Sequence, residues 1–440
     1  MKATLGRAAF PTLSLVAAFA AFAACGPAAR SNDAQVPAPT PVKAEATPAP
    51  APTPLAPGGE DFAGDVRLLY RAVACSGDEA LPPAFEPVVA EHCAWLNGVL
   101  EKYRDDYLQR ATPFLLKLRP TGLPPSVVYP FGGGDLLSAL LTYPDALEFT
   151  TVSLEHVGDP RRIRDMDAPR LAHSLAELRR RIKGLFAYAE STSENLMQMQ
   201  KGDIPGQLAF TLVALAAHGY EPVGLRYFRI EADGALHYFS ADEVEKEAAQ
   251  KARRLNTVWV SPDFAPVFSD AELTFRPKGA GKDVPLRVHR HVAANLSDAA
   301  LKKDAPVLRH LEAKGKVAAM TKAASYLLWA EGFSHIRDYL LGHMAFMISD
   351  STGIPAADAQ KAGFVLETYG RFKAPFLAAR KSPGDDLVKL WADQPYRELP
   401  FRYGYPDRSG QNHLLVTRPA AVTPPSPAPV ATPAPAQSRS

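Results

Sequence analysis

Apolar and polar residues along positions 61–418 follow periods that predict a mixture of helices and strands. The clearest pattern lies at 126–155. There, β-forming residues at 127–129 are followed by three glycines, by leucines at helical spacing and by a second β-rich run at 149–154. Strand, glycine turn, helix and strand within about thirty residues predict a βαβ unit with two parallel strands.

The segments around this unit predict an α/β domain with a mostly parallel sheet, an N-terminal helical cap and antiparallel hairpin additions. Apolar positions at three- and four-residue steps predict most of the helices, and alternating runs joined by turn residues predict the hairpins. The expected helices are 62–75, 88–107, 171–185, 207–218, 242–254, 299–311 and 336–348. The expected further strands are 223–230, 236–239, 267–275, 284–292, 317–320, 364–372 and 413–417.

Both ends of the chain have a composition that cannot bury a core. Residues 26–60 contain nine prolines and almost no large apolar side chain, and residues 419–440 contain seven prolines. Such segments extend by roughly 3 Å per residue where they adopt polyproline-like conformations. We therefore expect a tether over 25–60, a globular domain over 61–418 and a disordered tail over 419–440.

The first residues have the features of a secretory signal peptide at 1–24. Lys2 and Arg7 precede an apolar run at 13–24 that is too short for a membrane span, and Cys25 follows it. Residues 22–26, FAACG, resemble the lipobox of bacterial lipoproteins, although Phe22 stands where that family prefers leucine. The resemblance implies cleavage before Cys25, a diacylglycerol on its sulfur and an acyl chain such as palmitate on its amine.

The resemblance further implies an exported protein held on the lipid bilayer of the cell envelope through the acylated Cys25. Gly26 is not the aspartate that favours inner-membrane retention in enteric lipoproteins, so the outer membrane is favoured over the inner one. The alternative is an ordinary secreted protein with a coincidental cysteine.

Cysteine use and charge narrow the class of protein. Cys75 and Cys93 predict a disulfide in an oxidising compartment, worth about 3 kcal/mol for a loop of this length, with two buried thiols as the alternative. The sequence has no CxxC or Cys/His cluster, so we expect no structural zinc. A net charge of +2 with 22% charged residues gives no argument for a nucleic-acid partner.

The glycine turn is the first candidate ligand site. Gly132, Gly133 and Gly134, followed by Asp135 and by Glu155 after the second strand, resemble the phosphate-binding turn and ribose-binding acid of Rossmann-type folds, including methyltransferases. In those folds backbone N–H groups approach the ligand.

The turn departs from that pattern in two ways. Leucine replaces the third glycine of the dinucleotide pattern, and an aspartate at the helix start would repel phosphate. A structural turn in a Rossmann-like sheet is therefore favoured, and no cofactor is expected. An adenosyl or nucleotide ligand is the lesser alternative.

Other residues offer weaker signals. Lys322 follows the strand at 317–320 and is a candidate ligand-binding residue, because sites in α/β folds lie at strand ends. His289 and His291 share one face of a strand, but no third ligand follows by spacing, so no metal site is expected. Two larger sets of residues each have two interpretations. The aromatic set either lines a binding groove or fills the core, and it consists of Trp329, Phe333, Tyr403 and Tyr405. The basic set either binds lipid headgroups or forms a solvated helix face, and it consists of the arginines from Arg161 to Arg181.

No nucleophile motif of the GxSxG, SxxK, HExxH or P-loop type occurs. The leading hypothesis is a lipoprotein that acts as a binding or structural module of the cell envelope, with an envelope component as a candidate partner. Its core resembles bacterial lipoproteins that have no assigned activity. The first alternative is a degenerate, methyltransferase-type enzyme that uses Gly132 to Asp135 with Glu155. The second is a hydrolase of envelope polymers.

Overall fold

The computed structural model describes residues 58–187, 199, 202–249, 265–281, 283–302, 305–374, 381–404 and 411–420. The expected leader, Cys25, nearly all of the tether and of the tail, and Tyr405 lie outside the described residues.

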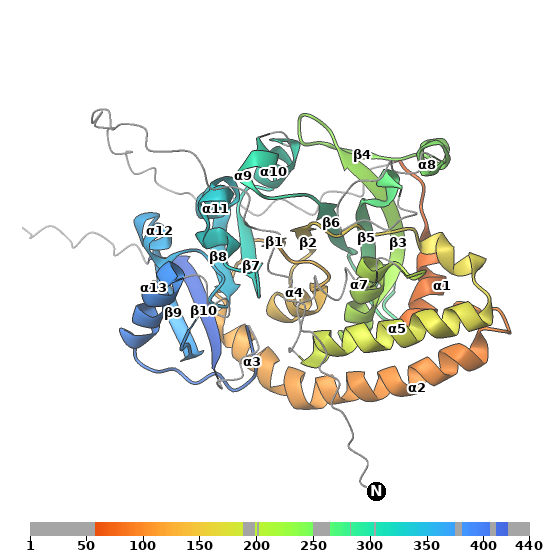
Figure 1. Ribbon diagram of the computed structural model, residues 1–440, viewed down its shortest axis with the longest axis horizontal. Coiled ribbons are helices and arrows are strands. Elements are labelled where there is room, and N and C mark those ends of the chain that lie inside the picture. Colours follow the sequence, from red (N-terminus) through yellow and green to blue (C-terminus); the bar gives the residue numbers. More distant parts are fainter. Residues whose placement is uncertain are drawn as a thin grey trace, which may run out of the picture. The chain divides into compact units, whose positions relative to one another are not determined.

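All ten strands of the described chain belong to one sheet, in the order β4-β3-β5-β6-β2-β1-β7-β8-β10-β9 (Figure 1). The five central strands, β6-β2-β1-β7-β8, are parallel, and every other pairing is antiparallel. The strands are β1 Ser126–Pro130, β2 Glu148–Ser153, β3 Tyr220–Ile230, β4 Leu236–Tyr238, β5 Asp270–Pro277, β6 Arg287–Ala293, β7 Val317–Thr321, β8 Met344–Ser349, β9 Phe364–Arg371 and β10 Asn412–Pro419.

The predicted α/β class with a Rossmann-like centre is confirmed. In chain order the parallel strands read 3-2-1-4-5, the order of Rossmann-type folds. The antiparallel additions are more extensive than expected, since they occupy both edges and make the sheet mixed as a whole.

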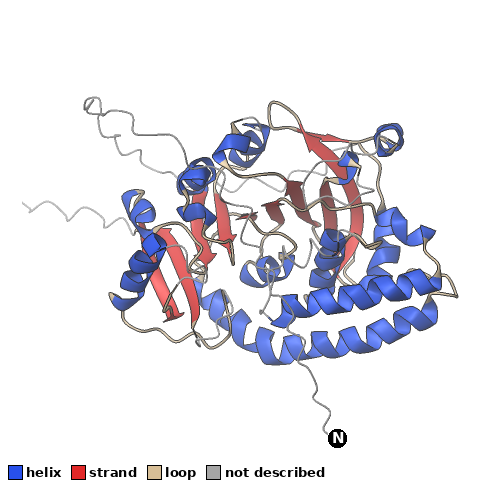
Figure 2. Cartoon of the chain, viewed as in Figure 1, coloured by secondary structure: helices blue, strands red, loops and turns tan. Residues whose placement is uncertain are grey.

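Helices cover both faces of the sheet (Figure 2). Successive strand residues contribute to opposite faces: Val127 and Tyr129 pack in one apolar cluster with helices α1 to α7, and Val128 packs in the other with α9 to α12. The helices are α1 Ala63–Val73, α2 Glu86–Lys102, the π-helix η1 Tyr103–Leu108, α3 Gln109–Leu118, α4 Leu136–Thr142, α5 Ala168–Ala187, α7 Gly206–Ala217, α8 Ala241–Ala248, α9 Asp298–Leu301, α10 Ala305–Glu312, α11 Ser334–His343, α12 Ala356–Lys361 and α13 Lys381–Ala392. Short 3₁₀ turns are η2 Pro160–Asp165, η3 Pro266–Phe268, η4 Leu327–Trp329 and η5 Glu331–Phe333.

The central βαβ prediction is confirmed, and β1 and β2 pair in parallel from Ser126 opposite Glu148 onward. Asp135 caps α4 by accepting a hydrogen bond from the backbone N–H of Ser138, at 3.1 Å. The buried helix predicted at 207–218 is α7, whose side chains are almost all buried, and the two predicted hairpins are β3–β4 and β5–β6.

Two helix predictions are wrong in part. The run 336–348 is not one helix, because α11 ends at His343 and Met344–Ser349 forms the central strand β8. Both faces of β8 are covered, so its residues are apolar without alternation and cannot be distinguished from a buried helix by period. The run 299–311 is divided between α9 and α10.

The N-terminal cap begins with α1 and continues through α2, η1 and α3, with α5 packed along α2 (Figure 1). A disulfide joins Cys75 and Cys93, whose Cα atoms are 5.3 Å apart, and so connects the end of α1 to α2. Among the helices described, none is long and apolar enough to cross a membrane.

Candidate functional site

The strand order reverses between β1 and β7. From β1 the parallel strands continue on one side to β2 and β6, and on the other side β7 is followed by β8. Doubly wound folds bind ligands at the carboxyl ends of the strands at such a crossover. The glycine turn 132–134 follows β1 and Lys322 follows β7, so the structure brings these predicted residues together at the crossover.

The glycine turn is shaped by contacts within the chain. A Cβ atom at Gly132 would lie 2.9 Å from Cγ of Tyr129, so this position requires glycine for packing. Gly133 has a φ of +50°, a left-handed conformation that favours glycine. The N–H of Phe131 donates to the carbonyl of Val152 at 2.7 Å. Packing and turn geometry therefore explain two of the three glycines without a ligand.

Lys322 reaches from the end of β7 to the start of α4. Its ammonium donates to Oγ of Ser138 at 2.8 Å and lies 3.7 Å from Oδ2 of Asp135. The hydroxyl of Tyr129 donates to the same carboxylate oxygen at 3.1 Å. The side chains of Lys322 and Asp135 are only 11% and 8% exposed, so the pair closes the crossover from within the chain.

Two tyrosines adjoin this pair. The Lys322 ammonium lies 5.6 Å from the centre of the Tyr403 ring, and the Tyr403 hydroxyl is buried without a hydrogen-bond partner among the described residues. Burial, and then the nearby carboxylates of Asp135 and Asp350, raise the pKa values of Tyr129 and Tyr403 well above the usual range. Both phenols are therefore neutral near pH 7.

Backbone strain is concentrated at the crossover. In the described chain five non-glycine residues have a left-handed φ, and four of them follow β1 or β7. They are Phe131 (61°), Ala323 (53°), Ser325 (52°) and Tyr326 (57°). Each costs about 1–2 kcal/mol, and such residues cluster at functional or switching positions. The loop after β8 holds the strained segment, since Asp350 accepts a hydrogen bond from the Ala323 N–H at 2.8 Å.

Glu155 is connected to the glycine turn through its backbone. The Glu155 carbonyl accepts a hydrogen bond from Nε2 of His291 at 2.7 Å, and Nδ1 of His291 accepts one from the amide of Gln207 at 3.0 Å. The Gln207 amide also donates to the carbonyl of Gly133 at 3.1 Å. Glu155 itself is 2% exposed, so the acid predicted for ribose hydroxyls is enclosed by protein.

The two strand histidines act as hydrogen-bonding groups within the sheet. Oγ1 of Thr151 lies 2.9 Å from Nε2 of His289 and 2.9 Å from Nδ1 of His291. Burial lowers the pKa of His289 to about 3 and also lowers that of His291, so both rings are neutral. In the described part of the chain, no group of three or more His, Cys, Asp or Glu is placed to hold a metal ion.

A serine–histidine pair that the sequence did not reveal lies beside β8. Oγ of Ser351 is 2.9 Å from Nε2 of His413 and 2.9 Å from the Tyr326 hydroxyl. The spacing is that of a nucleophile and a base, but Ser351 is 1% exposed and His413 is fully buried. No local motif joins residues 62 positions apart, and only the pairing of β8 with β10 brings them together.

The predicted basic run is neutralised. Every arginine of the run forms an ion pair with a carboxylate, which favours the solvated-face interpretation. The pairs are Arg161 with Asp159 and Glu245, Arg162 and Arg170 with Asp203, Arg164 with Asp65, Arg179 with Glu91, and Arg180 and Arg181 with Glu177.

The aromatic residues expected to form one groove belong to different apolar clusters. Trp329 packs with Tyr326, Phe333 lies edge-on to Phe131 at 5.7 Å between ring centres, and Tyr403 is buried on the opposite face. Tyr403 is a core residue, and Trp329 and Phe333 are partly buried in other clusters, so these three do not line a common surface.

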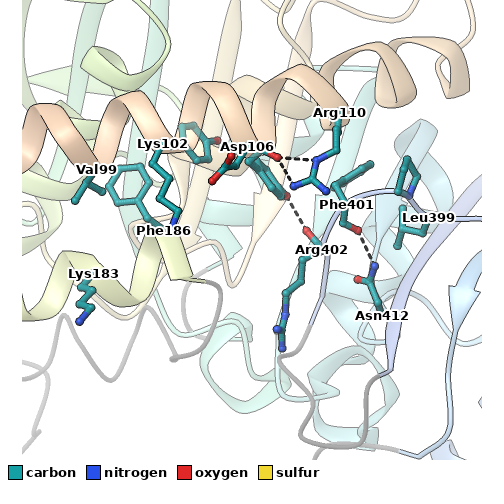
Figure 3. Close-up of a pocket in the computed structure, with 13 residues that line it drawn as sticks. Val99, Lys102, Asp106, Arg110, Lys183, Phe186, Leu399, Phe401, Arg402 and Asn412 are labelled. Carbon is teal, nitrogen blue, oxygen red and sulfur yellow. Dashed lines mark hydrogen bonds between the residues drawn. The ribbon is translucent and has the colours of Figure 1, made fainter.

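A different groove of about 520 Å³ opens between the N-terminal cap and the segment before β10 (Figure 3). In Figure 3, Lys102, Asp106 and Arg110 extend from one continuous helical segment, and Phe401 and Arg402 lie across from it. The groove is aromatic and cationic, and its rings and cations are Tyr103, Tyr107, Phe186, Phe401, Lys102, Arg110, Lys183 and Arg402.

The π-helix η1 carries both groove tyrosines. Their rings stack at 5.4 Å between centres, and the Tyr107 hydroxyl donates to the carbonyl of Arg402 at 2.9 Å. Asn412 at the start of β10 donates to the carbonyl of Phe401 at 2.6 Å. These two hydrogen bonds fix the helical wall and the wall formed by residues 399–402. The π-helix itself also marks the groove as a candidate site, because π-helical turns occur frequently at functional sites.

Comparison of the chain with protein-family models, with curated proteins and with solved structures found no match.

Buried neutral histidines predict a loss of stability in mild acid. In the unfolded chain a histidine has a pKa near 6.5, whereas burial lowers the pKa of His289 in the folded chain to about 3. Between these two pH values the unfolded state therefore binds a proton that the folded state does not bind, and the folded state loses stability as the pH falls. We expect the free energy of unfolding, measured by urea denaturation, to fall by several kcal/mol between pH 6.5 and 4. His289→Gln, which keeps an amide near the position of Nε2, should reduce that loss.

The control is His173→Gln, because His173 is exposed on α5. Asp270 has the opposite effect on stability, because burial raises its pKa to about 7 and its protonation in acid therefore favours the folded state. This effect is the same in the wild type, His289→Gln and His173→Gln. Parallel pH curves for the wild type and His289→Gln would contradict the assignment.

Proposed function

We propose that this chain is an exported, lipid-anchored module of the cell envelope that binds a ligand and carries out no reaction at its crossover. The observation that supports the absence of a reaction is the closure of the crossover by Lys322. Its ammonium is hydrogen-bonded to Oγ of Ser138 and lies 3.7 Å from Oδ2 of Asp135 at the start of α4. A nucleotide-type ligand would have to approach at this helix start.

Export and anchoring are supported by the sequence and by one covalent feature. The apolar leader and the lipobox-like residues around Cys25 indicate the route, with the outer membrane favoured. The Cys75–Cys93 disulfide is of the kind that forms in oxidising compartments outside the cytosol.

A binding role is supported by the contrast between the two candidate sites. At the crossover, Asp135 and Glu155 are buried, and the Lys322 side chain, which is only 11% exposed, pairs with Asp135. The groove beside η1 is instead open, with aromatic walls and exposed cations, as ligand sites commonly are.

A methyltransferase-type enzyme is the second candidate, favoured by strand topology. The parallel order 3-2-1-4-5 is that of Rossmann-type folds, the group whose glycine turn the chain resembles, and β10 is an antiparallel strand between β8 and β9. Topology alone does not imply activity, and the closed glycine turn argues against it.

Lipid attachment is tested by mass spectrometry of the N-terminal peptide, after the full chain is expressed in a bacterial host and purified from membranes. We expect the peptide to begin at Cys25 and to carry a diacylglycerol and an amide-linked acyl chain, because the lipobox directs both steps. Cys25→Ala should remain unprocessed and unacylated. A wild-type chain with an intact leader or an unmodified Cys25 would contradict the anchored module.

Closure of the crossover is tested by thermal unfolding with S-adenosylmethionine, S-adenosylhomocysteine, NAD and ATP. A ligand at 100 times its Kd stabilises by about 2.7 kcal/mol, which would raise Tm by several degrees. We expect shifts below about 1 °C, because the residues of the turn are buried and the Lys322 ammonium is hydrogen-bonded to Ser138 at the start of α4. A shift of several degrees that is lost in a cooperatively unfolding Gly133→Trp variant would favour the methyltransferase-type enzyme.

A further inference from the structure

The groove between η1, the end of α5 and residues 399–402 has two properties that together point to one class of ligand. Its floor is aromatic, and its rim carries more positive than negative side chains. We propose that it binds a single anionic phospholipid of the membrane that holds the chain, with the phosphate against Lys102 and Lys183 and an acyl chain along the rings. This proposal rests on the lipid anchoring proposed above.

Three cations of the rim have no carboxylate partner among the described residues. Within the described residues, the side chains of Lys102, Lys183 and Arg402 are exposed, and none of them forms an ion pair. The arginine run at 161–181 behaves differently, since each of its members has a carboxylate partner. Charge complementarity therefore favours an anion at the groove and not along the arginine run.

The floor offers an apolar surface of suitable size. Phe186 packs edge-on to Tyr103 at 5.2 Å between ring centres, and Phe401 packs edge-on to Tyr107 at 5.6 Å. The volume of about 520 Å³ lies in the range of sites that hold one small molecule. A small, highly charged anion such as inorganic phosphate would contact only the cations of the rim, whereas an amphiphile would contact both the cations and the aromatic lining.

The groove is partly pre-organised. Tyr107 and Asn412 hydrogen-bond the backbone carbonyls of Arg402 and Phe401, so the two walls are joined without the ligand. Little ordering entropy then opposes binding.

The tether makes the bilayer the nearest source of such a molecule. Residue 58, the first described, is 33 residues from Cys25. Fully extended, 33 residues span at most about 100 Å. An acylated Cys25 would therefore keep the groove within reach of lipid headgroups, and basic pockets bind anionic headgroups.

Calorimetric titration of the full chain carrying Cys25→Ser tests the proposal, with three probes below their micellar concentrations. The probes are dihexanoyl phosphatidylglycerol, dihexanoyl phosphatidylcholine and glycerol 3-phosphate. We expect the phosphatidylglycerol to bind at least about tenfold more tightly than either other probe, and to bind less tightly at high salt. Lys102→Glu combined with Lys183→Glu should weaken its binding by at least about tenfold, because the phosphate would then face two carboxylates in place of two cations.

Lys361→Glu is the matched control, because Lys361 is an exposed lysine on α12, outside the groove lining, and should leave binding unchanged. Equal binding of the two lipids would overturn the anionic preference, and equal binding of glycerol 3-phosphate would assign the site to a free phosphate. Unchanged binding in the Lys102/Lys183 variant would overturn the location. Because the probe is added to a chain that lacks Cys25, these results do not depend on whether the natural chain is acylated.

Discussion

A buried cation beside a buried carboxylate holds the crossover of the sheet together. Lys322 comes from the end of β7 and Asp135 from the start of α4, and both side chains are almost wholly enclosed. Removing one member of such a pair leaves the other charge buried without compensation, which typically costs about 3–5 kcal/mol. The glycine turn, the strained loop after β7 and the phenol of Tyr129 all take their positions around this pair. The pair therefore lies where a Rossmann-type sheet would otherwise offer a ligand site.

The side chain of Tyr403 lies between the crossover and the groove. The Tyr403 ring lies 5.6 Å from the Lys322 ammonium and 6.3 Å from the Phe401 ring, which belongs to the groove wall. Gly404 follows with a φ of +76°, and a Cβ atom there would lie 2.8 Å from Cβ of Asp350. The segment 401–404 is therefore packed on the crossover on one side and lines the groove on the other. The proposed binding groove therefore lies beside the crossover of the Rossmann-like sheet.

The sequence predicts those elements whose formation depends on residues close together in the chain. The βαβ unit, α7 and both hairpins follow from period, glycine and turn residues. Strand β8 was missed because a strand buried on both faces has no alternation to detect. Lys322 was found by its position after a strand, but its partner Ser138 lies 184 residues earlier, and no local pattern connects them. The groove was missed for a similar reason, because its walls come from distant segments of the chain.

If Lys322 is enclosed at the crossover in solution, its amine should react slowly with a reagent in the solvent. Reductive methylation of the native chain, followed by peptide mass spectrometry, compares its rate with that of exposed Lys361. We expect Lys322 to react more than about tenfold more slowly, the factor that about 1.4 kcal/mol of hydrogen bonding and burial produces. Equal rates for Lys322 and Lys361 would show that the crossover is open to solvent.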